Sequence, residues 1–216
     1  MTGLIWKDFL VMRKALKSYL LLVVFYILLA YLDFFDYSFI ITFVQVVLSV
    51  LPISAFAYDE QAKWDRYAMA LPLGRRGVVR ARYLFVLALA LLTMALGLAG
   101  TGLLYLVRQA DPLEMFITLM VSSTVGLIIP TVLLPLSYKL GAERARPYLF
   151  AIIFIPVIAV ILLAKAGVLD VSLLKGMELL SPAALAGNAL LLPLAGLAGL
   201  FLSYLVSCRI AAGKEF

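Results

Sequence analysis

The sequence predicts an all-α integral membrane protein with six transmembrane helices. Its 216 residues are 65% hydrophobic and only 14% charged, and the mean hydropathy is +1.11. A soluble domain is about half apolar and about a quarter charged. The apolar residues gather in long runs without the alternation of a barrel strand, so each run is expected to be a helix that bonds its own backbone in lipid. We expect residues 1–216 to form a single transmembrane domain.

The first 17 residues predict a short amphipathic helix. Large apolar residues recur at helical spacing, and lysines lie on the other side: Ile5, Phe9, Met12 and Leu16 against Lys7, Lys14 and Lys17. We expect this helix to lie in the inner membrane interface, in contact with lipid, with Trp6 as an anchor at headgroup level. The alternative is a plain basic flank of the first span.

Six apolar runs follow, and a helix of about 20 residues crosses a bilayer. The first is the shortest and needs its tail through residue 35 to reach that length. The runs are residues 18–31, 39–57, 83–107, 115–136, 148–164 and 187–206. Glycines in the third run, Gly97, Gly100 and Gly102, are expected to permit close helix approach.

Charge is distributed unequally between the two ends of these helices. The segments that share a side with both termini carry 15 of the 18 Lys and Arg residues. Cytoplasmic segments retain such residues, so we expect both termini in the cytoplasm. The net charge of +6 follows from this rule, and nucleic-acid binding is not expected.

Residues 167–186, between the last two runs, mix leucines with acidic and basic residues. The segment is long for a turn and too interrupted to cross. We expect short helices that dip into the outer leaflet.

Residues 58–76 form the one densely charged block. We expect a cytosolic helix that continues the second span unbroken as far as Pro72 and Gly74. Aromatic and arginine side chains anchor protein interfaces, so the candidate partner-binding residues are Asp59, Glu60, Lys63, Trp64, Asp65, Arg66 and Tyr67. The alternative is a solvated helix with internal ion pairs such as Asp59 to Lys63.

Thr42, Gln45 and Ser49 recur on one face of the second span. Two interpretations remain open: they line a translocation path, or they bond to a neighbouring helix. Ionisable residues are missing from the middle of every run, which disfavours ion-driven transport.

Several kinds of chemistry are not expected of this chain. It has no histidine and one cysteine, Cys208, so a Cys/His metal site cannot be assembled. It also lacks the G-x-x-x-x-G-K-[ST] phosphate loop. We therefore expect no enzyme activity, no metal and no cofactor in this chain, with energy supplied by a partner.

The chain resembles the ABC-2-type permease family, in particular its small six-span bacterial members. The likeness rests on LIWKDF at residues 4–9, YDEQAKWDRY at 58–67, LPL at 71–73 and the Arg75–Arg76 pair. It extends over essentially the whole chain.

The resemblance implies a permease subunit of an exporter in the bacterial cytoplasmic membrane. Its expected partners are two copies of an ABC ATPase subunit, which holds ATP and Mg, a second permease that is a copy or a paralogue, and membrane lipid. Residues 59–67 would form the coupling helix that docks on the ATPase. The cargo would be amphipathic or hydrophobic: a peptide, an antibiotic or a lipid-like molecule. The alternative is a non-transporting immunity or sensor protein that binds a peptide.

Overall fold

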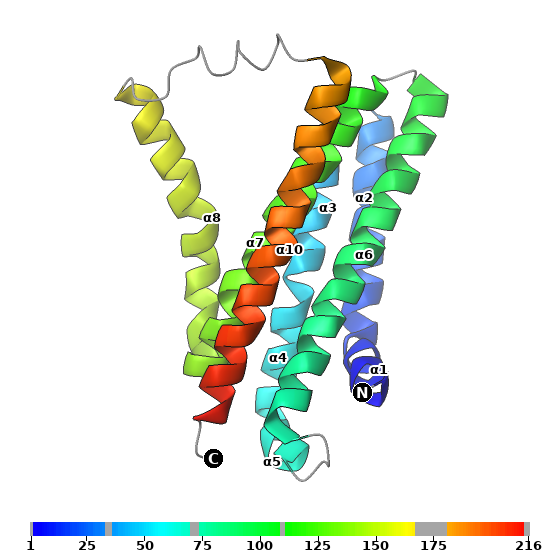
Figure 1. The fold of residues 1–216 in the computed structure, drawn as a ribbon. Helices are drawn as coiled ribbons and strands as arrows, with labels where there is room; N and C mark the ends of the chain where they lie inside the picture. The colour runs from blue at the N-terminus through cyan, green and yellow to red at the C-terminus, as the bar shows by residue number, and fades with distance from the viewer. Residues whose placement is uncertain (1, 33–35, 70–73, 109–110, 167–180, 214–216) are drawn as a thin grey trace.

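A computed structural model describes residues 2–32, 36–69, 74–108, 111–166 and 181–213. Every element within these ranges is a helix (Figure 1). The elements are α1 (Thr2–Val11), α2 (Arg13–Tyr31), α3 (Tyr37–Ser49), α4 (Leu51–Gln61), α5 (Trp64–Met69), α6 (Gly74–Arg108), α7 (Pro112–Leu140), α8 (Ala142–Lys165) and α10 (Pro182–Ala212).

Helix α7 is the centre of the bundle. It packs against α3, α6, α8 and α10, and the contact with α10 runs along much of its length. Helix α8 meets α7 near Gly141 and then diverges from it (Figure 1). The start of α1 and the end of α10 lie at the same end of the bundle as α5.

A hydroxyl cluster joins three of the long helices. The Tyr83 hydroxyl on α6 lies 2.7 Å from the hydroxyls of both Ser203 and Ser207 on α10. Ser203 in turn donates to the carbonyl of Thr131 on α7 at 2.6 Å. Small hydroxylated residues let transmembrane helices approach closely and bond across the contact.

Five described segments are long and apolar enough to cross a membrane, where the sequence predicted six spans. They are Ser38–Gln61, Gly74–Gly102, Pro112–Leu140, Ala142–Lys165 and Ala184–Ala212. Helix α2 is not among them. Only residues 18–31 of the predicted first span lie in α2, about 21 Å of helix, and its predicted tail at 33–35 falls outside the described residues.

The helix predicted over residues 1–17 is divided at Met12, between α1 and α2. The apolar side of this segment packs on the protein. Met12 is fully buried with Leu51 of α4 and Phe85 of α6, and Phe9 meets Phe85 edge-on with ring centroids 5.0 Å apart. Trp6 remains 66% exposed.

The second and third spans have other boundaries than the apolar runs that predicted them. The second is divided at Val50, directly before Leu51 and Pro52, into α3 and α4. The third begins at Gly74 rather than at residue 83, so Arg75 and Arg76 belong to the first turn of α6. Of the predicted dipping segment, residues 167–180 lie outside the described part of the chain, and 182–186 form the start of α10.

The predicted close approach is found at only one of three glycines in α6. A Cβ atom on Gly97 would overlap Cδ1 of Leu119, whereas one on Gly100 or Gly102 would meet nothing within 4 Å. Of these three glycines, Gly97 is the one at a close contact between α6 and α7.

Candidate functional site: the charged segment and the polar face of the second span

The charged segment is not one continuous helix. Helix α4 ends at Gln61, Ala62 caps it, and Lys63 has a positive φ of 51° before α5 begins at Trp64. The unbroken helix predicted as far as Pro72 is therefore wrong. A residue with left-handed backbone dihedral angles interrupts a right-handed α-helix, even where its neighbours in the sequence favour a helix.

Asp59 faces into the protein and bonds to two distant cations. Lys7 donates to both of its carboxylate oxygens, at 2.7 and 2.8 Å. Arg82 donates to its Oδ2. These bonds, in place of the Asp59–Lys63 pair of the alternative interpretation, join α4 to α1 and α6.

Asp8 completes the network with a second buried carboxylate. It lies 3.1 Å from Lys7 Nζ and 3.0 Å from Arg82 Nη1. The Arg82 Nη1 group forms no hydrogen bond, so its contact with Asp8 is an ion pair without hydrogen-bond geometry. Burial raises the pKa of Asp8, although Arg82 and Lys7 oppose that shift.

Two carboxylates and two cations thus meet where α1, α4 and α6 converge. Asp8, Asp59 and Arg82 are each less than 10% exposed. Removing one member of such a group leaves an uncompensated buried charge, which is far more costly than losing a surface ion pair. The network therefore holds the three helix ends together.

Glu60 links the same segment to α8. Its Oε2 accepts a hydrogen bond from the backbone N–H of Ala142 at 2.6 Å. Gly141, with φ of 89°, turns the chain from α7 into α8 there, and a Cβ on it would lie 2.6 Å from Glu60 Oε1. A carboxylate at a helix N-terminus satisfies a free N–H and interacts well with the helix dipole.

The remaining predicted partner-binding residues divide between the interior and the surface. The Trp64 ring is half-buried beneath Lys7 Nζ, 4.5 Å from the ring centroid. Tyr67, 6.5 Å from Trp64 between ring centroids, is 68% exposed, and Lys63 is exposed as well. Asp65 and Arg66 belong to α5, but their side chains fall outside the described residues.

The three polar residues of the second span face α7. The Thr42 and Ser122 hydroxyls lie 2.7 Å apart, and Gln45 Nε2 donates to Ser123 Oγ at 3.1 Å. Ser49 bonds back to the carbonyl of Gln45 at 2.6 Å. The bond to a neighbouring helix, one of the two interpretations that the sequence allows, is thus present for Thr42 and Gln45.

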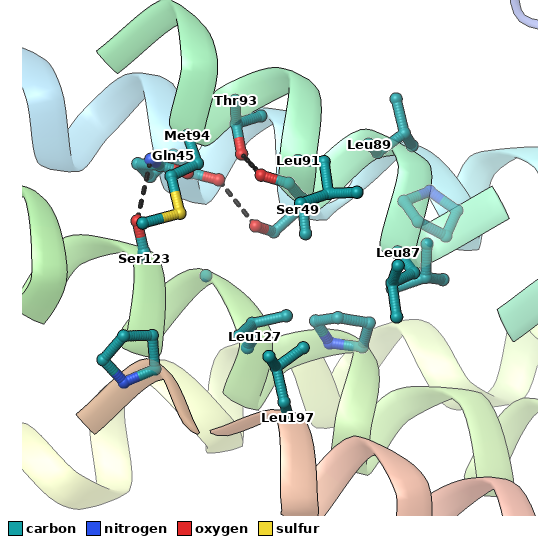
Figure 2. Close-up of a pocket in the computed structure, with 16 residues that line it drawn as sticks. Gln45, Ser49, Leu87, Leu89, Leu91, Thr93, Met94, Ser123, Leu127 and Leu197 are labelled. Atoms are coloured by element: carbon teal, nitrogen blue, oxygen red, sulfur yellow. Dashed lines mark hydrogen bonds between the residues drawn. The ribbon is translucent and has the colours of Figure 1, made fainter. Parts of the chain in front are cut away.

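A cavity of about 130 Å³ lies beside this polar face (Figure 2). Gln45 and Ser49 contribute to one wall, Thr93 and Met94 of α6 to a second, and Leu127 of α7 to a third. Figure 2 shows Gln45 and Ser123 joined by their hydrogen bond at one end of this space.

Three residues of the charge network are not among the candidate site residues that the sequence singles out: Lys7, Asp8 and Arg82. Their position in the sequence is the signal that could identify them. Like Asp59, each is a charged residue close to the predicted cytoplasmic end of an apolar run, and a buried carboxylate there needs a cation nearby.

Comparisons with known proteins define the family. A family model described as "ABC-2 family transporter protein" matches residues 3–212, nearly the whole chain. Comparison with curated proteins and with solved structures gives no match. Permeases of this family associate with an ABC ATPase, which agrees with a multi-pass bundle that has a charged segment at one end. The chain therefore belongs to the ABC-2 family, as the membrane permease of an ABC transporter.

Proposed function

We propose that the chain exports an amphipathic or hydrophobic molecule across the bacterial cytoplasmic membrane, driven by a separate ATPase that docks on residues 58–76. The ATPase, in two copies, would hold ATP and Mg, and a second permease would complete the transporter. The observation that carries the proposal is the buried bonding of Asp59 to Lys7 and Arg82.

This network supports mechanical transmission. A docking segment can transmit movement from the ATPase only if its own displacement also displaces the membrane helices. The last turn of α4 is tied to α1 and α6 through Asp59 and to the start of α8 through Glu60. A push on α5 would therefore reach α1 and α6 through the buried charge network, and α8 through the hydrogen bond of Glu60.

The exposed side of the segment supports docking. Tyr58 is 50% exposed and Tyr67 68% exposed, and both lie at the end of the bundle that holds α5. Tyrosine and arginine anchor protein interfaces because they combine large contact area with hydrogen bonding. Tyr67 and the neighbouring Arg66 are thus the proposed contacts with the ATPase.

The direction of the chain in the membrane follows from charge. The described helix ends around α5 include the basic residues Lys14, Arg76, Lys139, Arg144 and Arg209. Basic segments of this kind are retained in the cytoplasm. Both ends of the chain would then face the cytoplasm, where the ATPase is.

Helix α8 supports the second permease. Ala142 and Ala145, in its first turn, are buried, and no other residue of α8 is buried in the single chain. The surface of α8 that includes Phe150, Phe154 and Ile158 is exposed in the single chain. Such a surface suits a second permease or lipid.

The spans support an amphipathic or hydrophobic cargo. Asp, Glu, Lys and Arg occur only near the ends of the five described spans. Ion-coupled sites place a charge near the membrane midplane. An uncharged bundle is better matched to an apolar or amphipathic cargo, and the polar face of Thr42, Gln45 and Ser49 is the proposed path.

Binding of the ATPase by the purified permease tests the proposal. We expect Arg66→Glu and Tyr67→Ala each to weaken binding at least about tenfold, because interface hot spots cost roughly 2 kcal/mol or more. Tyr67→Ala should keep the wild-type unfolding temperature, because Tyr67 is 68% exposed.

Arg209→Glu is the matched control, since it reverses an exposed charge at the same end of the bundle outside residues 58–76. It should bind as the wild type does. If Arg66→Glu and Tyr67→Ala bind the ATPase and stimulate ATP hydrolysis as well as this control, the docking proposal is wrong.

A further inference from the structure

The cavity beside Gln45 is lined by five helical segments. Its walls come from α3, α4, α6, α7 and α10, and its volume is about 130 Å³. An apolar cavity of roughly 150 Å³ in a protein can stay free of water and bind benzene. The space here is of the size that holds one six-membered ring.

The cavity wall carries two hydrogen-bonding atoms that no described contact uses. Gln45 is 3% exposed, and its Nε2 bonds to Ser123, but its amide oxygen has no bonding partner among the described residues. The Ser123 hydroxyl accepts that bond, and its own hydrogen is committed to no acceptor in the described part of the chain. The acceptor and the donor thus belong to neighbouring side chains, whose Nε2 and Oγ atoms lie 3.1 Å apart.

The Gln45 side chain belongs to the cavity wall. Among the described residues, Arg82 Nη1 is the polar side-chain atom that is completely enclosed without a hydrogen-bond partner. The Gln45 oxygen is not enclosed in this way, although the residue as a whole is buried and lines the cavity. A buried amide left without a partner is costly, so a ligand that supplies a donor gains from this position.

Access is from the side of the bundle. Leu87 and Leu91 of α6 and Leu197 of α10 line the cavity and are also exposed on the outer surface of the single chain. Both helices belong to described spans. A molecule dissolved in the membrane could thus enter between α6 and α10 without crossing a charged region.

We propose that this cavity binds an apolar group of about the size of a phenyl ring that carries one hydroxyl, with the hydroxyl placed between the Gln45 oxygen and the Ser123 hydroxyl. A hydroxyl both donates and accepts, and so satisfies both wall atoms at once. Water fits less well, since buried waters usually make about three hydrogen bonds. The other polar groups of the wall, Ser49 and Thr93, already bond to backbone carbonyls.

Binding concerns the permease alone and is measured without ATPase. Failure here therefore leaves the docking proposal untouched, and failure of docking leaves the cavity proposal untouched. The hydroxyl-bearing group has two possible sources, a membrane lipid or a membrane-dissolved cargo.

The probe is 4-fluorophenol, with fluorobenzene as the analogue that lacks the hydroxyl. We expect the ¹⁹F signal of 4-fluorophenol to show saturable broadening with purified permease. Ala90→Leu, which fills the cavity, should abolish the saturable part. Ala95→Leu should keep it, because Ala95 is exposed on the same helix and does not line the cavity.

The hydroxyl recognition is tested by Gln45→Met, which keeps the size of the side chain and removes the amide. We expect wild-type permease to bind 4-fluorophenol roughly two- to tenfold more tightly than fluorobenzene, and this preference to disappear in the variant. Equal binding of the two probes by the wild type would refute the role of Gln45.

The proposal as a whole is overturned if broadening is not saturable, or if Ala90→Leu binds like Ala95→Leu. Should Ala90→Leu fail to fold, Thr93→Leu fills the same space and takes its place. Mass spectrometry of lipids that copurify distinguishes the sources. A lipid enriched on the wild type over the filled variant identifies lipid, and equal lipid contents with saturable probe binding identify a membrane-dissolved molecule.

Discussion

Asp59 is the residue on which the charged segment depends. We expect Asp59→Asn to lower the free energy of unfolding by about 3–5 kcal/mol, because Lys7 and Arg82 would lose their shared buried carboxylate. Denaturant unfolding of the purified permease in detergent measures this.

Glu143→Gln is the control for Asp59→Asn. It neutralises an exposed carboxylate in the first turn of α8 and should change the free energy of unfolding little. Equal stability of the two variants would show that the network does not hold the helix ends together.

Asp8 predicts a specific pH dependence of stability. Burial raises its pKa above the ordinary value of 3.8 in the folded protein, so the folded state binds the proton more tightly than the unfolded chain does. The contribution of Asp8 to stability is then fully present below pH 3.8 and is lost as the pH rises through the raised pKa. The charged residues that face Asp8 are Lys7, Arg82 and Asp59, and they are unchanged when the wild type is compared with Asp8→Asn.

The measurement is the free energy of unfolding across the acid range for the wild type and Asp8→Asn. Between pH 3.8 and the raised pKa of Asp8, the wild type should lose stability relative to Asp8→Asn as the pH rises. Asp111→Asn, at an exposed helix cap, should leave the curve parallel to that of the wild type. A difference of the opposite sign for Asp8→Asn would mean that attraction by the cations outweighs burial.

At the scale of elements, one pair of glycines in α6 tests the packing against α7. Gly97→Ala places a Cβ against the fully buried Leu119 and should cost about 1–3 kcal/mol in stability. Gly100→Ala faces open space and should be neutral or stabilise by up to about 1 kcal/mol. Thermal unfolding of both variants compares them directly, and equal effects would contradict the packing of α6 on α7.

The long apolar runs made most helices predictable. The runs at 115–136 and 148–164 lie inside α7 and α8. They could be predicted because an apolar run of about 20 residues in a membrane protein indicates a transmembrane helix. The break at Lys63 could not be predicted in this way, because lysine has no preference for a left-handed backbone and only the folded surroundings impose it.

At the scale of the whole molecule, the site depends on contacts between distant parts of the chain. Lys7 and Arg82 lie 52 and 23 residues from Asp59 in sequence. The charged segment is recognisable by composition, and the one partner for Asp59 that local spacing offers is Lys63, in the alternative interpretation. Helical periodicity relates residues three or four apart and contains no information about which helix ends converge.

The bundle places α5 at one end and the top of α6 at the other (Figure 1). Tyr67 and Tyr105 are exposed tyrosines on these helices, 68% and 51% exposed. They form a matched pair for locating the ATPase, because the same substitution can be made at both sites with Cys208 replaced by serine.

The most direct test of ATPase docking on residues 58–76 is site-specific crosslinking from these two positions in the assembled transporter. Tyr67→Cys carrying a photoreactive maleimide should crosslink to the ATPase, and Tyr105→Cys carrying the same reagent should not. An assembled transporter in which position 67 gives no crosslink to the ATPase, or in which position 105 does, would contradict the account.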